Sequence, residues 1–174
     1  MIRRLEQHEV DRVWSIDRSE TVRGEYRLER GTLVVGPAHH DVTGWPPGEA
    51  EHYGPLLHDC FERGGSFFGA FEGDTLAGAA VLESRFIGAA KDQLQLVFLH
   101  VSRRSRGSGT GRALFEAATA RAKELGAGRL YVSATPSENT IRFYLHRGCR
   151  VADEVDAELF AREPEDIHLS FVIP

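Results

Sequence analysis

Residues 98–113 constrain the fold more than any other segment of the chain. The residues at 94–101 are almost wholly apolar, which predicts a strand buried on both faces of a sheet. Gly107, Gly109 and Gly111 follow, and a helical pattern begins among them. Glycines at the start of a helix leave backbone N–H groups accessible, and these groups and the helix dipole attract anions. We therefore expect a strand, a tight turn and a helix that form an anion-binding site.

Four arginines lie in the same short stretch: Arg103, Arg104, Arg106 and Arg112. The whole chain carries 26 Asp and Glu against 21 Lys and Arg, a net charge of −5. An acidic chain is a poor binder of nucleic acid, because affinity for a phosphate backbone needs an extended basic surface. The local reversal of charge therefore predicts a small ligand that carries several phosphates.

Two common phosphate-binding patterns do not fit this turn. A P-loop ends in Gly-Lys-Ser/Thr, and this lysine is absent. A dinucleotide-binding turn reads Gly-x-Gly-x-x-Gly and is followed by an acid about 20 residues later. Here the glycines read Gly-x-Gly-x-Gly, and the next expected strand ends without an acid. A nucleotide-binding domain is therefore only a weak alternative.

Strands and amphipathic helices alternate along the 174 residues, a length that favours one domain. Strands are expected at 2–5, 67–72, 75–86, 94–101, 129–135, 151–155 and 167–173, and helices at 8–18, 49–63, 109–125 and 137–147. A short hairpin at 26–35 turns at Arg30-Gly31, and a Pro- and Gly-rich loop covers 36–48. This order predicts the mixed α/β (α+β) class, with a central sheet covered by helices.

The pattern Arg106-x-x-Gly109-x-Gly111, between a buried strand and a helix, resembles motif A of the GNAT acetyltransferase superfamily over about residues 94–126. Residues 129–149 resemble motif B, with a strand, a break, and a helix that carries Phe143-Tyr144. The resemblance implies a single acetyltransferase domain over residues 1–174. It would have about six to seven strands in a mixed sheet, about four helices and an extra short N-terminal hairpin.

The resemblance also implies acetyl-CoA as the cosubstrate. In this superfamily the pyrophosphate lies on backbone amides of the turn, and the preceding strand pairs with the pantetheine arm. The matching residues here are Leu99, His100, Val101, Arg106, Gly107, Ser108, Gly109, Thr110, Gly111 and Arg112. Many members also contact the cofactor through an Asn seven residues before a tyrosine of motif B. Ser137 holds that position here and Asn139 lies two residues later, so either side chain is a candidate.

Tyr144 is the proton donor that the resemblance implies for the departing CoA thiolate. A phenol with a pKa of about 10 suits a leaving thiol with a pKa of about 8.5. Phe143 lies about 100° around the helix and is expected to fill the core instead. Cys149 is interpreted as a buried, inert thiol.

The general base is not evident, because the positions where members of the superfamily carry Glu hold Gln95 and Val132. Gln95 could hold a water molecule, and Asp92 at the start of the strand could accept the proton. His100 is a further candidate on its chemistry, although a packed histidine is the simpler interpretation. Strict alternation along the strand places His100 on the face opposite to Gln95 and Val101.

The amine acceptor is expected over the N-terminal region and the last strands, where acidic and aromatic side chains suit a cation. The candidates are Glu20, Tyr26, Asp41, Trp45, Glu163, Glu165 and Asp166. No metal is expected, because the histidine pairs His39-His40 and His52/His58 lack the spacing of a four-ligand zinc site.

The sequence therefore predicts an N-acetyltransferase that moves an acetyl group from acetyl-CoA to a primary amine of a small molecule or peptide, by direct attack in a ternary complex. The missing carboxylates leave a second hypothesis open, a catalytically silent acyl-CoA-binding sensor or interaction module. No apolar run reaches the ~18 residues of a membrane span. Two cysteines give no disulfide framework. We expect a cytoplasmic monomer or homodimer that binds neither membrane nor nucleic acid.

Overall fold

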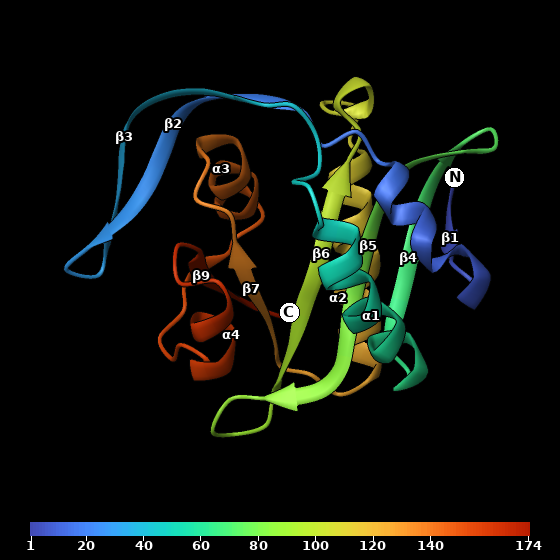
Figure 1. Cartoon of the computed structure of the whole chain (residues 1–174). Coiled ribbons are helices and arrows are strands. Elements are labelled where there is room, and N and C mark those ends of the chain that lie inside the picture. Colours follow the sequence, from blue (N-terminus) through green and yellow to red (C-terminus); the bar gives the residue numbers. More distant parts are fainter.

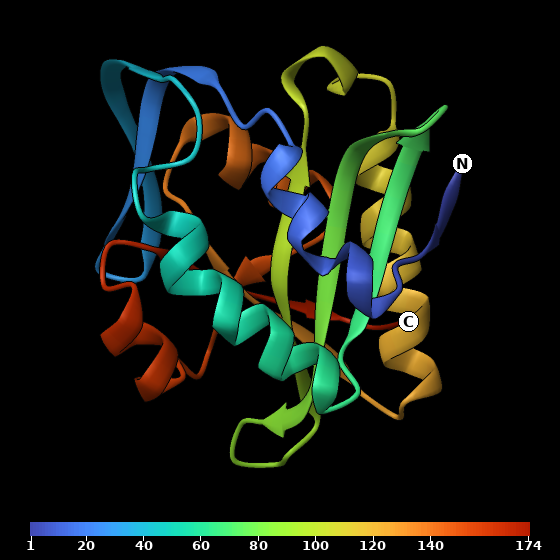
Figure 2. The same cartoon turned by 45° about the vertical axis from the view of Figure 1, so that its right-hand side comes forward.

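The computed structural model describes residues 1–174, which form a seven-stranded sheet, a separate two-stranded hairpin, and helices on both faces of the sheet (Figure 1; Figure 2). The strands are β1 (Ile2–Arg4), β2 (Glu20–Glu29), β3 (Thr32–Val42), β4 (Ser66–Glu72), β5 (Thr75–Ile87), β6 (Gln93–Val101), β7 (Arg129–Ala134), β8 (Arg150–Val151) and β9 (Ile167–Val172). The helices are α1 (Glu49–Glu62), α2 (Thr110–Glu124), α3 (Glu138–His146) and α4 (Ala157–Arg162), with 3₁₀ helices η1 (Gln7–Ser15) and η2 (Arg103–Ser105). The mixed α+β class is confirmed.

The sheet has the strand order β1-β4-β5-β6-β7-β9-β8, and β6 with β7 is the one parallel pair. These two strands share only three residue pairs, which join Gln93, Leu94 and Gln95 to residues 129–131. Beyond Gln95 the strands diverge, as Figure 1 shows. Two unpaired strand edges therefore face each other across the middle of the sheet.

Helices cover the two faces of the sheet with separate hydrophobic cores. On one face α2 and α3 bury Leu114, Ala118 and Ile141 against the strands. On the other face η1 and α1 contribute a second core that includes Val13 and Leu57 (Figure 2). No helix is both long and apolar enough to cross a membrane.

A β-bulge in β6 changes which face its side chains reach. Leu82 of β5 pairs with Leu96, whereas the adjacent Val81 pairs with Phe98, so β6 carries one extra residue between them. Leu96 packs in the core under α2, and Phe98 packs in the core under α1. The prediction that His100 and Gln95 lie on opposite faces is therefore wrong, because the bulge reverses the alternation between them.

Two other predicted elements differ from the structure, and one helix was not predicted. The hairpin is long, because β3 continues to Val42 through part of the expected loop. The turn at Arg30-Gly31 is confirmed, and β2 passes beside α3, where the Tyr26 N–H donates to the Pro136 carbonyl at 2.8 Å. The strand expected at 151–155 contains only Arg150–Val151. Helix α4 was not predicted, because its six residues are too few for a clear periodic pattern.

Glu9 joins the N-terminal segment to the sheet. Its side chain is 7% exposed. It accepts two hydrogen bonds from Arg3 at 2.7 Å, one from Arg12 at 3.1 Å and one from the Glu6 N–H at 3.0 Å. Arg12 also donates to the Asp74 carbonyl at 2.6 Å. The hydrogen bond from Arg3 is the main reason that the pKa of Glu9 falls from its ordinary 4.5 to about 2.

Replacing Glu9 with Gln is expected to lower the free energy of unfolding by about 1–2 kcal/mol at pH 7, because charged hydrogen bonds are lost. A carboxyl whose pKa is lowered on folding contributes its full stabilisation above the unfolded pKa. The difference between variant and parent should therefore shrink as the pH falls from 4.5 towards about 2. Urea denaturation at several pH values measures this. Glu62→Gln, on the exposed end of α1, is the control. A difference that does not change with pH would contradict the assignment.

Candidate functional site

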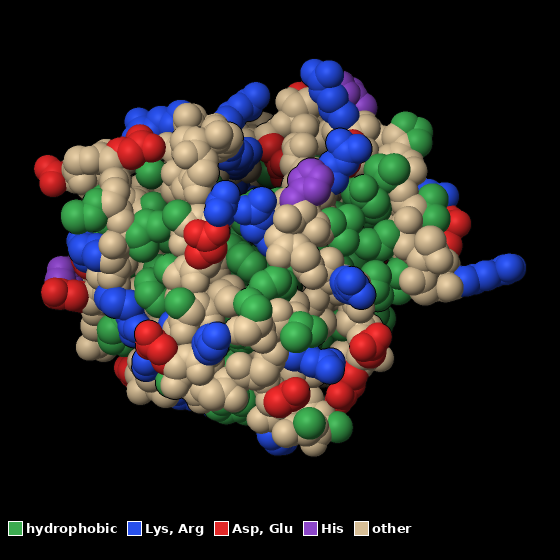
Figure 3. Space-filling model, turned by 180° about the vertical axis from the view of Figure 1, so that it is seen from behind, with side chains coloured by type: hydrophobic (Ala, Val, Ile, Leu, Met, Phe, Trp, Pro, Cys, Tyr) green, Lys and Arg blue, Asp and Glu red, His purple; other side chains and the backbone are tan.

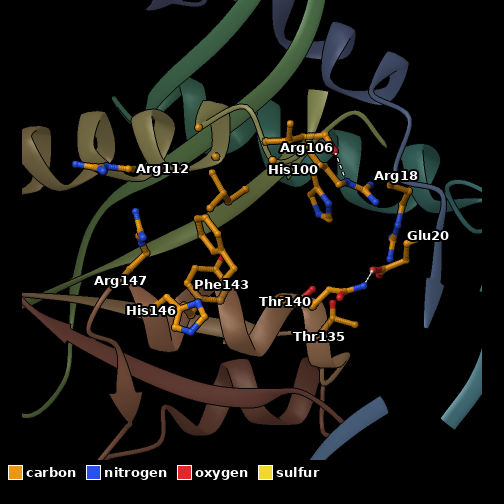
Figure 4. A pocket seen from close by; sticks show the side chains of 17 residues that line it. Arg18, Glu20, His100, Arg106, Arg112, Thr135, Thr140, Phe143, His146 and Arg147 are labelled. Atoms are coloured by element: carbon orange, nitrogen blue, oxygen red, sulfur yellow. Dashed lines mark hydrogen bonds between the residues drawn. The ribbon is translucent and has the colours of Figure 1, made fainter. Parts of the chain in front are cut away.

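A pocket of about 660 Å³ opens between the diverging ends of β6 and β7. Its walls come from the end of β6, the turn before α2, the segment before β2, and α3 (Figure 4). The lining residues are Arg18, Glu20, Leu99, His100, Val101, Arg106, Gly107, Gly109, Gly111, Arg112, Thr135, Asn139, Thr140, Phe143, Tyr144, His146 and Arg147. The pocket therefore brings together the predicted tyrosine and most of the strand and turn residues predicted to bind a cofactor.

The turn before α2 presents a run of free backbone donors to this pocket. Gly107 and Gly109 have φ values of 78° and 90°, which side-chain-bearing residues rarely adopt. Helix α2 begins directly after Gly109, so the N–H groups of its first turn have no helical acceptor. None of the backbone N–H groups of residues 107–112 finds an acceptor within the protein. These donors, at the positive end of a helix, form the anion site that the sequence predicted.

One end of the pocket is positively charged. Figure 4 shows Arg112 and Arg147 at this end with His146, away from Arg18 and Glu20. The Nε of Arg147 is buried and has no hydrogen-bond partner. On the face of the molecule that lies behind the sheet in Figure 1, Lys and Arg side chains gather with a histidine in the upper middle of Figure 3. Arg112 and Arg147 therefore line the same pocket as the glycine turn with its free N–H donors.

Tyr144 and Phe143 form the wall of the pocket on α3. Tyr144 is 6% exposed and belongs to the core under α2, and its hydroxyl makes no hydrogen bond within the protein. Burial first, and then the nearby Cys149 and Asp166, raise the pKa of Tyr144 above its ordinary value. The phenol therefore keeps its proton at neutral pH. Phe143 was predicted to fill the core in place of Tyr144. This prediction is wrong in one respect, since Tyr144 is the more deeply buried of the two rings.

Phe143 sets how closely α3 approaches α2. A Cβ on Gly111 would lie 3.2 Å from the Phe143 ring, so a larger residue would push the ring back by a few tenths of an ångström. The ring also lies edge-on to Phe115 of α2, with centroids 6.3 Å apart. Gly111 therefore serves close packing, whereas the other two glycines of the turn serve the backbone conformation.

Arg106 connects the end of β6 to the segment before β2. Its Nε donates to the Val101 carbonyl at 2.9 Å, and its Nη1 donates to the Ser19 carbonyl at 2.8 Å. Its Nη2 donates to the Asp17 carbonyl at 3.3 Å. The Arg103 N–H donates to the same carbonyl at 2.9 Å. Arg106 lines the pocket, but its guanidinium holds the backbone around the turn.

The other end of the pocket contains His100, Arg18 and Glu20 (Figure 4). His100 lies edge-on to Trp45, with ring centroids 4.9 Å apart. Burial first, and then the charges of Arg18 and Arg106, lower the pKa of His100 to about 3. The imidazole is therefore neutral at physiological pH. Glu20 accepts a hydrogen bond from Asn139 at 3.2 Å.

The structure distinguishes between the two candidates at the start of α3. Ser137 is buried and caps the helix, where its Oγ accepts the Thr140 N–H at 3.4 Å. Asn139 lines the pocket instead. Ser108 and Thr110 contribute backbone to the turn, but their hydroxyls contact each other at 2.9 Å beside a separate cavity of about 310 Å³.

Several predicted catalytic and acceptor residues lie outside the pocket wall. Asp92 precedes β6 at the end remote from the turn, 4.0 Å from Arg129. Gln95 is the last β6 residue paired with β7, at the point where the strands separate. Asp41 is exposed and accepts a hydrogen bond from Thr21 at 2.8 Å. Trp45 packs against the His100 ring outside the pocket wall, and its indole N–H donates to the Ile16 carbonyl at 2.9 Å.

Sequence reasoning missed six lining residues: Arg18, Thr135, Thr140, Phe143, His146 and Arg147. His146 and Arg147 follow Tyr144 at the C-terminal end of α3, about one turn after Phe143, and this spacing was a usable signal. Arg18 gave no signal, because it reaches the pocket only through the path of the chain after η1.

The profile of the acetyltransferase (GNAT) family matches residues 31–149. Nourseothricin acetyltransferase has a similar structure, with a TM-score of 0.75 at 22% identity, over 100% of this chain and 98% of that one. A putative streptothricin acetyltransferase from Bacillus anthracis str. Ames, in complex with acetyl coenzyme A, gives 0.74 at 16% identity over 100% and 98%. PaiA N-acetyltransferase from Thermoplasma acidophilum, in complex with coenzyme A, gives 0.64 at 18% over 99% and 98%. No curated protein matches the sequence.

Replacing Arg106 with Leu is expected to lower the free energy of unfolding by about 1–2 kcal/mol, because three backbone carbonyls lose a charged donor. Arg104→Leu is the matched control, since Arg104 is exposed and its nearest carboxylate lies 3.9 Å away. It should change stability by less than about 0.5 kcal/mol. Urea denaturation measures both, and equal losses would contradict the structural role of Arg106.

Proposed function

The chain belongs to the acetyltransferase (GNAT) family, and from this premise we propose that it transfers the acetyl group of acetyl-CoA to a primary amine within a ternary complex. The observation that carries the proposal is the row of unbonded N–H groups at residues 107–112 on the wall of the pocket. Such a row suits a pyrophosphate, whose charge is spread over several oxygens.

The remaining walls fit the other parts of the same molecule. Leu99, His100 and Val101 pair with β5 on one side only, so their other edge is open to the pocket along an extended arm. Arg112 and Arg147 offer charge for a further phosphate at the cationic end. Acetyl-CoA supplies the thioester that reacts, and Tyr144 is the donor placed to protonate the departing sulfur.

The charges around the pocket favour an amine as the acceptor. Glu20 lies at the end opposite to Arg112 and Arg147 (Figure 4). Burial, and then the charges of Asp166 and Glu49, raise the pKa of Glu163, so these carboxyl groups share one region. A region rich in carboxylates attracts a cationic acceptor of the small-molecule or peptide class.

Tyr144 favours an enzyme over a silent acyl-CoA sensor. A binding module needs no protonated phenol in its pocket, and this hydroxyl has no other hydrogen-bond partner.

The two cysteines, Cys60 and Cys149, are buried and free. We propose a reducing compartment, the cytoplasm, for this chain.

Calorimetric titration with acetyl-CoA should give a dissociation constant below 100 µM, about −5.5 kcal/mol. Release of free CoA is then measured with nourseothricin, spermidine and L-lysine as acceptors.

Tyr144→Phe should lower kcat by about 100-fold with unchanged acetyl-CoA affinity, since only the proton donor is lost. Phe143→Leu, in the same wall, is the control for packing. Binding without turnover of any amine would favour the sensor, and full turnover by Tyr144→Phe would exclude it as the acid.

Replacing Arg147 with Gln should weaken CoA binding about tenfold, because a charge-assisted contact to phosphate is lost. Binding of pantetheine, which carries no phosphate, should stay within twofold of the parent. Arg142→Gln is the matched control, since Arg142 lies on the same helix outside the pocket and pairs with Glu138 at 3.3 Å. Equal weakening for CoA and pantetheine would contradict a phosphate contact.

A further inference from the structure

The two faces of the sheet carry different chemistry where β6 and β7 separate. Tyr144 packs in one core with Val132 and Ile167, on the face of α2 and α3. Side chains alternate along a strand, so Ser133 of β7 points to the opposite face. Tyr131 lies on that opposite face as well, where its hydroxyl contacts His168 Nδ1 at 2.6 Å. The phenol of Tyr144 and the side chain of Ser133 therefore approach the opening from opposite faces.

Asp166 stands on the Ser133 face, at the edge of the opening. Ala134 pairs with Ile167 in the antiparallel ladder of β7 and β9, and continuing this register sets Asp166 beside Thr135. Thr135 lines the pocket. The Ser133 hydroxyl donates to Asp166 Oδ2 at 2.8 Å, which fixes the carboxylate and leaves Oδ1 without a partner in the protein. Asp166 is thus a half-buried, oriented carboxylate next to the pocket wall.

Titratable groups on three segments lie within electrostatic range of Asp166. Burial raises the pKa of Asp166 above its ordinary value, and the hydrogen bond from Ser133 and the nearby His168 of β9 oppose this rise. Burial is the main reason that the pKa of Tyr144 is raised, and Cys149 and then Asp166 add to it, so Asp166 lies within electrostatic range of the phenol. In the preceding loop, burial and then the charge of Asp166 raise the pKa of Glu163. Glu49 and His52 of α1 also affect the pKa of Glu163, so the start of α1 lies close to this loop. A carboxylate in such surroundings is a stronger base than an exposed one.

Other candidate bases near the pocket are less suited. Gln95 is uncharged at the point where the strands separate. Burial lowers the pKa of His100 to about 3, which makes its imidazole a weak base. Glu20 is bonded to Asn139 and lies near the guanidinium of Arg106. Asp166 is the carboxylate that lies beside the pocket residue Thr135 and contributes to the raised pKa of Tyr144.

We propose that Asp166 is the general base of the transfer and that the acceptor amine enters from the face of Ser133, between the start of α1 and the loop before β9. This inference rests on the proposed function. The amine nitrogen forms a bond to the acetyl carbonyl carbon, and the bond from that carbon to sulfur breaks. An acceptor that binds as an ammonium ion first releases one proton to solvent, so that the attacking nitrogen is neutral. During the transfer the nitrogen gives one proton to Asp166, the sulfur takes one proton from Tyr144, and solvent returns a proton from Asp166 to Tyr144. The products are the acetamide and free CoA, with no net change in the protein.

The test compares Asp166→Asn, Asp166→Glu and Asp153→Asn in the full chain. Asparagine keeps an acceptor for the Ser133 hydroxyl, so the fold and the acetyl-CoA dissociation constant should change by less than about twofold. With the best acceptor among nourseothricin, spermidine and L-lysine, Asp166→Asn should lower kcat by about 100-fold or more. It should also remove the fall in kcat that the parent shows at acidic pH. Asp166→Glu should recover at least about a tenth of the activity. Asp153→Asn makes the same charge change at an exposed residue and should stay within twofold.

Three outcomes would overturn the assignment in distinguishable ways. A parent chain that binds acetyl-CoA but acetylates none of the three amines overturns both the proposed function and the base. An Asp166→Asn variant with kcat within threefold of the parent overturns the base alone. A variant that raises KM for the amine at unchanged kcat also overturns the base, since Asp166 would then only attract the cation.

Discussion

Only three residue pairs join β6 to β7 in the middle of the sheet. The rest of the site depends on the shortness of this parallel ladder. A longer ladder would pair the backbone of Leu99 and Val101 with β7 and close the opening. Instead the extra residue of the β6 bulge and the early separation leave strand edges free. Backbone N–H and C=O groups that are not paired within a sheet are satisfied by water or by a ligand. An extended ligand arm suits this edge, and the helices on the two faces decide what reaches it.

Charge is distributed so that the two sides of the opening differ. The chain is acidic overall, at −5, yet the pocket has free N–H donors, Arg112 and Arg147 at one end. Glu163 and Asp166 lie on the other face, beside the last strand. This separation favours a compact polyanion on one side and a cation on the other. The glycines of this turn have two different roles. Gly109 adopts a positive φ, which leaves backbone N–H donors exposed, and Gly111 allows α3 to pack close to α2.

Much of this was predictable from sequence, because it resides in local patterns. The apolar strand, the glycines and the helix that follows are contiguous, and so are the strand and helix that carry Tyr144. Helix ends at Gly64, Gly126 and Gly148 were also predictable, because each glycine has a positive φ. Contacts between distant segments were not predictable. Arg106 looked like a phosphate ligand, and only the path of the chain through Asp17 to Ser19 reveals its backbone partners.

The face of a side chain was the least predictable property. One bulge moved His100 to the side of Gln95, and a long hairpin replaced part of the loop at 36–48. The sequence predicted Asp166 only as one of several candidates to contact the amine acceptor. The register of β9 against β7 and the hydrogen bond from Ser133 place it at the opening. Long-range pairing of this kind depends on tertiary packing, which a single sequence does not display.

The central claim is that the free edge of β6 and the turn before α2 together bind one CoA molecule. The most direct measurement follows the backbone amide signals in a ¹H–¹⁵N NMR spectrum while CoA is added. The signals of Gly107, Gly109 and Gly111 should shift together with those of Leu99 and Val101, at one common ligand concentration. Unchanged signals at saturating CoA, or shifts confined to the second cavity around Ile2 and Ala70, would contradict the account.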